Sequence, residues 1–303
     1  MGSVLILLLF LLGGYGAQHL LTLDAQERWA ERFNHFVIYV SLPALVFVYM
    51  VDLKVDSRFI LPIGSAWGLF ILSAAALLLL SRVLGWSKSL TGALLMVIPY
   101  GNTSFLGVPF TKAFFGDAGI PYAVIYDQLG SFLILSTVGL VTLSVYGSQK
   151  VTLSRVLYRI FTFPAFVILI AALLMDRSMV PDWLMDLLSL LAATLTPAAL
   201  LSIGLYLKLR LDRDKLTAFG VGLLLKLLIA PLVLLALFWL MGLQGLSAQV
   251  TLFEAAMAPM VSSSMLALSA GLERRFVASI LGYGIVLSFI TLPLWYLLIQ
   301  GSI

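Results

Sequence analysis

The sequence predicts an all-α polytopic membrane protein with ten transmembrane helices, arranged as a 5+5 inverted repeat. The 303-residue chain is 62% hydrophobic and 11% charged, with a mean hydropathy of +1.10. That leaves too little charge for the surface of a soluble domain of this size. Apolar stretches of about 20 residues recur along the chain, each long enough for a bilayer of about 30 Å. The second half also repeats features of the first.

Eight of the expected spans are predicted to cross the membrane without a major break: residues 4–22, 33–51, 59–83, 119–146, 160–175, 187–207, 216–241 and 276–299. The other two, the fourth (89–115) and the ninth (248–271), contain interruptions. The first span is expected to be a retained helix rather than a cleaved signal peptide, because no basic residue precedes it and because it completes the first repeat.

The repeat follows from a shift of about 155 residues between the two halves. Pro43 in the second span then aligns with Pro197 in the seventh, and Gly116 aligns with Gly271. With the same shift, the interrupted fourth span aligns with the interrupted ninth. Because each repeat holds an odd number of spans, the second copy must enter the membrane from the opposite side.

The basic residues predict the orientation of the chain, since cytoplasmic loops are enriched in Lys and Arg. One side collects Arg28, Arg32, Arg82, Lys88, Lys150, Arg155, Arg159, Lys208, Arg210, Arg213, Lys215, Arg274 and Arg275, and the other only Lys54, Arg58, Lys112 and Arg177. Both termini are therefore expected on the extracytoplasmic side of an inner or plasma membrane. The net charge of +4 is no nucleic-acid signal, because these residues lie between spans.

The two interruptions are the predicted substrate site. Pro99, Gly101, Gly107 and Pro109 prevent one continuous helix in the fourth span, and Pro259 breaks the ninth. Broken helices persist inside a membrane only where they face protein or a watery cavity. The expected substrate-binding residues are Asn102, Thr103, Ser104, Pro259, Ser262, Ser263 and Ser264.

Asn102, Thr103 and Ser104 are also good caps for a helix that restarts at this point. The N-terminus of such a helix favours an anion. Equivalent breaks in two inverted repeats are expected to meet near the bilayer midplane, as in secondary transporters. The alternative is a pair of packing kinks whose serines are satisfied within their own helices.

Four polar residues within the spans are candidates for ion coupling or charge pairing: Asp127, Gln128, Lys226 and Glu254. Charges at this depth are costly and usually face a cavity or a partner. The carboxylates would carry a proton or a sodium ion, and Lys226 would attract an acidic substrate. Alternatively, Lys226 forms a structural ion pair with Glu254 or Asp127.

Several other functions find no support in the sequence. The chain lacks cysteine, and no metalloprotease, nucleophile-elbow or ATP-binding motif is present. No catalytic residue or organic cofactor is therefore expected, and we predict that the protein is not an enzyme.

The residues around the two breaks resemble the auxin efflux carrier family of secondary transporters, in its bacterial form. The resemblance is carried by residues 34–47, by Gly101–Pro109 with its Asn-Thr-x-x-x-Gly-x-Pro element, by residues 126–132 and 258–262, and by Thr291–Pro293. It extends over essentially the whole chain. The connector between the fifth and sixth spans is short, whereas plant members carry a long regulatory loop there.

The resemblance implies a scaffold domain (residues 1–58 and 150–215, helices 1, 2, 6 and 7) and a mobile core or transport domain (59–149 and 216–303, helices 3–5 and 8–10). It also implies a homodimer that contacts through the scaffold, and an asparagine, here Asn102, near the substrate carboxylate. More distant bile-acid symporters use an acid on the ninth span to bind sodium, which would place Na⁺ near Glu254 and Asn102.

Together these features predict a secondary active transporter of small organic anions such as dicarboxylates or auxin-like acids, working by alternating access. Its partners would be the anion, the lipid bilayer and a second copy of the chain, with H⁺ or Na⁺ as the coupling ion. The alternative is a receptor or sensor that binds a small carboxylate on a transporter fold.

Overall fold

Helices form the regular structure, and no strand occurs in residues 2–54, 56–147, 152–209, 211 and 213–303, which the computed structural model describes. This confirms the all-α prediction. Lys150 and Arg210, two of the basic residues that predict the orientation, lie outside the described residues.

Six helices of the described chain are long and apolar enough to cross a membrane. They are Leu23–Met50 (α2, Leu23–Phe36; η1, Val37–Ser41; α3, Leu42–Met50), Ser57–Val83 (η2, Ser57–Phe59; α4, Ile60–Val83), Asp117–Tyr146 (η4, Asp117–Gly119; α7, Ile120–Ile125; η5, Tyr126–Phe132; η6, Leu135–Gly139; α8, Leu140–Tyr146), Asp182–Tyr206 (α11, Asp182–Ala193; α12, Leu195–Tyr206), Leu216–Leu240 (α13, Leu216–Leu224; η9, Leu225–Ile229; α14, Ala230–Leu240) and Arg274–Ser302 (α17). The helix that contains the predicted second span begins earlier than that span, at Leu23, with the amphipathic α2.

A seventh span results if the bent pair α9 (Leu153–Thr162) and α10 (Pro164–Leu174) is taken as one. The two helices meet at an angle of 61°. The predicted sixth span, 160–175, therefore corresponds to α10 together with the last residues of α9. Pro164 stands in the first turn of α10, where proline is tolerated, and the chain turns just before it.

The remaining apolar segments are too short to be assigned as spans by length and composition alone. They include α1 (Gly2–Ala17) and α5 (Lys88–Val97). Short 3-10 turns, η7 (Arg177–Met179) and η8 (Arg213–Lys215), lie between longer helices. The ten-span count and the inverted repeat therefore stay predictions.

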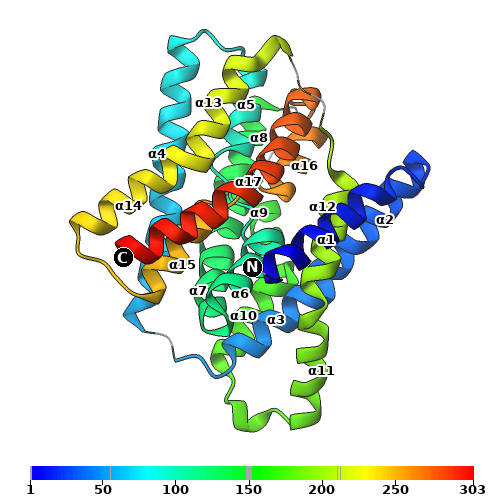
Figure 1. Ribbon diagram of the computed structural model, residues 1–303, viewed down its shortest axis with the longest axis vertical. Helices are drawn as coiled ribbons and strands as arrows, with labels where there is room; N and C mark the ends of the chain where they lie inside the picture. Colours follow the sequence, from blue (N-terminus) through cyan, green and yellow to red (C-terminus); the bar gives the residue numbers. More distant parts are fainter. Residues whose placement is uncertain (1, 55, 148–151, 210, 212) are drawn as a thin grey trace.

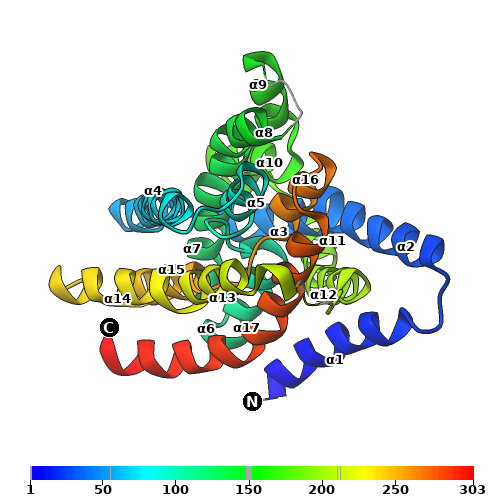
Figure 2. The same cartoon turned by 90° about the horizontal axis from the view of Figure 1, so that it is seen from above.

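Two sets of helix contacts can be followed in Figures 1 and 2. In the first set, α1 and α2 pack against α12, and α3 packs against α10 and α11. In the second set, α4 packs against η5 and α15 (Leu246–Ala255), with α13, α14 and α17 nearby. The assignment of a scaffold domain and a mobile core to particular residues stays a prediction.

Glycines allow the closest helix contact in the first set. A Cβ atom on Gly14 of α1 would lie 2.4 Å from the Leu201 carbonyl oxygen, and one on Gly204 of α12 would lie 2.3 Å from the Leu11 carbonyl oxygen. Small residues of this kind let membrane helices approach until their backbones touch. Gly14 and Gly204 thus fix the packing of α1 on α12.

Candidate functional site

Both predicted interruptions are present, and the first is shorter than expected. The fourth span stops after α5, is irregular over residues 98–102, and resumes as the π-helix η3 (Thr103–Gly107) and α6 (Val108–Phe115). The ninth stops after α15 and resumes as α16 (Val261–Ser269). Gly107 and Pro109 were expected to belong to the first break, which is wrong. Pro109 sits in the first turn of α6, where its missing N–H costs little.

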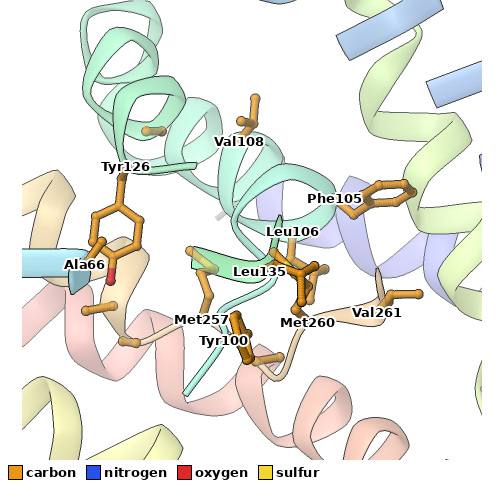
Figure 3. Packing of buried hydrophobic residues seen from close by; sticks show 14 of the residues in the cluster. Ala66, Tyr100, Phe105, Leu106, Val108, Tyr126, Leu135, Met257, Met260 and Val261 are labelled. Atoms are coloured by element: carbon orange, nitrogen blue, oxygen red, sulfur yellow. The ribbon is translucent and has the colours of Figure 1, made fainter. Parts of the chain in front are cut away.

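The two interruptions cross each other. Gly101 and Pro259 form an isolated antiparallel bridge. The N–H of Asn102 donates to the Ala258 carbonyl at 2.8 Å, and the N–H of Met260 donates to the Tyr100 carbonyl at 3.2 Å. Figure 3 shows Tyr100 and Met260 together at this crossing, under Leu106 and Leu135. The prediction that the two breaks meet is therefore confirmed, and their exposed backbone groups are paired with each other.

Two helix N-termini begin at the crossing without side-chain caps. Neither η3, which follows Asn102, nor α16, which follows Met260, has a side-chain cap hydrogen bond. The caps expected from Asn102, Thr103 and Ser104 are not made, because the two hydroxyls donate elsewhere. First-turn N–H groups and the helix dipole favour a negative charge at such ends.

Asp127 on the π-helix η5 is the acceptor for those hydroxyls. Its side chain is 1% exposed, and it accepts hydrogen bonds from Thr103, from Ser104 Oγ at 2.6 Å and from Gln128 Nε2 at 2.6 Å. All these donors are neutral. A buried carboxylate without a counter-charge is costly inside a membrane, so Asp127 is a candidate for carrying a proton or a cation.

Glu254 lies in the last turn of α15, on the other side of the crossing, and is fully buried. Its Oε1 accepts from Thr111 Oγ1 of α6 at 2.8 Å, while Oε2 has no hydrogen-bond partner. A Cβ atom on Gly107 would lie 2.1 Å from that Oε2. Gly107 is therefore needed for clearance, and the glutamate of one interrupted helix packs directly against the other.

Lys226 does not form the structural ion pair that the sequence left open. Its ammonium is buried on the π-helix η9 and donates to the Ala255 carbonyl at 3.4 Å. Among the residues that the structure describes, neither Glu254 nor Asp127 forms an ion pair with it. Lys226 thus lies against the end of α15 and next to the crossing, where a Cβ atom on Gly101 would lie 3.3 Å from its ammonium nitrogen.

The serines after Pro259 divide into two kinds. Ser263 and Ser264 donate to the Met260 carbonyl at 3.2 and 2.8 Å, so their hydroxyls are satisfied within their own helix. Ser262 instead lines a cavity. Asn102 is 2% exposed, and its amide nitrogen has no partner. An unpaired buried donor at the crossing is available to a ligand.

The cavity beside the crossing has an empty volume of about 430 Å³, open solvent at its mouth included. Its polar lining residues are Ser104, Asp127, Arg159 and Ser262, and its apolar ones are Ile38, Leu42, Phe105, Phe132, Leu135, Phe163 and Met260. Of the predicted substrate-binding residues, the cavity is thus lined by Ser104 and Ser262.

Arg159 was missed as a site residue, because the sequence placed it in a cytoplasmic connector. It lies on α9, which the 61° bend before α10 sets apart from the span that follows. The signal that could have found it is Pro164, which separates the basic helix from the apolar one.

Five of the polar residues at or near the crossing lie on an unusual backbone. Thr103 and Ser104 lie on η3, Asp127 and Gln128 on η5, and Lys226 on η9, all of which are π-helices. Short π-helical segments are rare and frequently occur at functional sites. Within the described residues no group of three or more His, Cys, Asp or Glu side chains could hold a metal ion. A sodium ion near Glu254 and Asn102 stays a prediction.

Comparisons with known proteins agree with this architecture. A family model described as "Membrane transport protein" matches residues 1–296. An uncharacterized transporter of Methanothermobacter thermautotrophicus is 28% identical over 296 residues, which cover 97% of this chain and 96% of that protein. Another uncharacterized transporter, from Methanocaldococcus jannaschii, is 25% identical over 312 aligned positions, with 97% of each chain covered.

The match extends across both interrupted helices and their crossing, so it includes the whole candidate site. The resemblance seen in the residues around the breaks is thereby confirmed. The chain belongs to the membrane transport protein family, the family of the auxin efflux carriers.

Proposed function

We propose that the protein is a secondary active carrier of small organic anions, such as dicarboxylates or auxin-like acids. The observation that carries this proposal is the crossing itself. Two helix N-termini without side-chain caps meet there, beside a cavity that Ser104 and Ser262 help to line. Such ends favour an anion, and the membership of a transporter family supports movement of that anion.

Alternating access at this crossing is the proposed mechanism. It rests on ten spans in two inverted repeats, with one interrupted helix contributed by each repeat. The core (59–149 and 216–303) would move against a scaffold (1–58 and 150–215) through which two copies associate. In support, the two interruptions pair with each other through Gly101 and Pro259, although they lie far apart in the sequence.

The coupling ion is proposed to be H⁺ or Na⁺, held by Asp127 or Glu254. Asp127 has only neutral donors, among them Gln128, and Glu254 leaves one carboxylate oxygen unpaired. A proton or a sodium ion would remove the cost of each uncompensated charge. Lys226 is then a charge near the crossing rather than a ligand of the substrate.

Counterflow in proteoliposomes tests the proposal. Purified protein would be reconstituted with one unlabelled organic acid inside, and uptake of the labelled acid would be followed with and without a sodium gradient or a pH gradient. We expect saturable exchange of at least one acid, and uphill accumulation with one of the gradients. A receptor or sensor would bind the acid without exchange, and an enzyme would release a changed product that mass spectrometry detects.

Asn102→Ala is expected to lower transport at least about tenfold, since losing a hydrogen bond to a charged group costs about 1.5–3 kcal/mol. The matched control is Asn34→Ala, which removes the same amide from α2. Transport by the Asn102 variant within twofold of wild type, at equal amounts of inserted protein, would remove Asn102 from the site.

The proposed location is an inner or plasma membrane with both termini on the extracytoplasmic side. Because the chain contains no cysteine, a single cysteine placed near either end can be probed with a membrane-impermeant thiol reagent in intact cells. Labelling at both ends supports the orientation, and labelling only after lysis contradicts it.

A further inference from the structure

The cavity at the crossing contains a cation that the proposed function does not use. Arg159 is the one basic residue among the described residues that line it. No hydrogen bond or ion pair of its guanidinium occurs within the described part of the chain. A guanidinium offers five N–H donors in a planar fork that matches a carboxylate. An unpaired, half-buried arginine on the wall of a cavity is therefore available to an anionic ligand.

The surrounding helices fix the position of this arginine. α9 ends at Thr162, and the chain turns at Phe163, whose ring stacks on that of Phe132 with 4.2 Å between the centroids. Both rings line the same cavity as Arg159. The aromatic pair thus anchors the end of α9 one turn beyond the arginine, at the edge of the site.

The rest of the cavity limits how many negative charges it can accommodate. Ser104 Oγ already donates to the Asp127 carboxylate, which is the other ionisable group on the wall. Most of the remaining lining is apolar, including the rings of Phe105, Phe132 and Phe163. A second carboxylate on a ligand would be buried among these side chains, close to Asp127 and without a cation, which is unfavourable.

We propose that Arg159 is a specificity-determining residue: its guanidinium binds the carboxylate of the substrate, and as the single cation it makes the cavity select acids with one carboxylate on an apolar body over dicarboxylates. This inference rests on the proposed function as a carrier of organic anions. It narrows the substrate class and adds a residue from α9 to a site otherwise built from the two interrupted helices and η5.

The test is counterflow with a panel of labelled acids, with phenylacetate and hexanoate as monocarboxylates and succinate and malate as dicarboxylates. We expect wild-type protein to exchange a monocarboxylate with a KM at least about tenfold below that of either dicarboxylate. Arg159→Gln should raise the KM of that monocarboxylate about tenfold or more, as expected when a charged hydrogen-bond partner is lost. Its kcat should change much less.

Two further variants separate binding from folding. Arg159→Lys keeps the charge and should recover part of the lost affinity. Arg155→Gln removes the same charge from an exposed position one turn earlier on α9, and its KM should stay within twofold of wild type. Monodisperse elution in detergent establishes that each variant is folded.

The outcomes distinguish this inference from the function on which it rests. If wild type exchanges none of the panel acids, the proposed organic-anion carrier fails, and the inference with it. If wild type exchanges an acid and Arg159→Gln leaves its KM unchanged, only the role of Arg159 is overturned. A wild-type preference for succinate or malate would overturn the proposed selectivity.

Discussion

The two interrupted helices meet at one crossing, yet they use their hydroxyl groups in different ways. After the first break, Thr103 and Ser104 donate outward, to Asp127 on η5. After the second, Ser263 and Ser264 donate back to the Met260 carbonyl of their own segment. The two breaks thus differ: the hydroxyls after the first break bind a buried carboxylate on another helix, and two of those after the second break bind the backbone of their own segment.

Gly107→Ala is expected to have the largest effect, because it tests whether the two interrupted helices depend on each other. The added Cβ would lie 2.1 Å from Glu254 Oε2, so the glutamate must move and lose its bond to Thr111. Overpacking of this kind costs about 1–3 kcal/mol. We expect a clear fall in the melting temperature of the detergent-solubilised protein.

Gly64→Ala on α4 is the matched control, since no atom lies within 4 Å of its added Cβ. Removing the clashing side chain with Glu254→Ala in the Gly107→Ala background should restore part of the lost stability. A Gly107→Ala protein that melts at the wild-type temperature would show that the two segments move apart easily.

Ser104→Ala and Ser264→Ala compare the two breaks directly. Ser104→Ala removes a hydrogen-bond donor from the buried Asp127 carboxylate. Losing such a donor costs about 1–3 kcal/mol. We therefore expect the transport rate, and its dependence on the driving ion, to fall several-fold. Losing Ser264 removes only a bond within its own helix and should change transport less than twofold. Equal losses from the two variants in proteoliposome exchange would contradict the asymmetry described above.

Lys226→Met is expected to have the smallest effect on substrate affinity. Lys226 contacts the end of α15 through the Ala255 carbonyl and does not line the cavity. Replacing a buried, unpaired ammonium by an apolar side chain of similar length should leave the KM within twofold and should not lower the melting temperature. A large rise in KM would instead place this cation on the path of the anion and add it to the site.

The interruptions themselves could be predicted from the sequence, whereas the contacts around them could not. Pro99, Gly101 and Pro259 disfavour a helix by their own chemistry, so both breaks were located without knowledge of the fold. The partner of a hydroxyl depends on which helix lies nearby. The sequence therefore could not distinguish Ser104, which donates to Asp127, from Ser264, which donates to Met260.

Arg159 and Gly107 illustrate what local patterns miss. A basic residue before an apolar span is normally a topology signal, and only the bend before Pro164 brings α9 to the cavity. Gly107 resembled a helix breaker, but its role is to leave space for a carboxylate more than a hundred residues away in the chain. Both features depend on tertiary packing, which propensity and periodicity do not contain.

The bonds that join the two interruptions use main-chain atoms alone: the N–H groups of Asn102 and Met260, and the carbonyls of Ala258 and Tyr100. Any residue except proline can supply such a donor. These two hydrogen bonds therefore do not depend on which side chains stand at the four residues, apart from proline at the two donors. In evolutionary terms, the side chains of these four residues can be exchanged one at a time while the backbone link between the two helices stays in place.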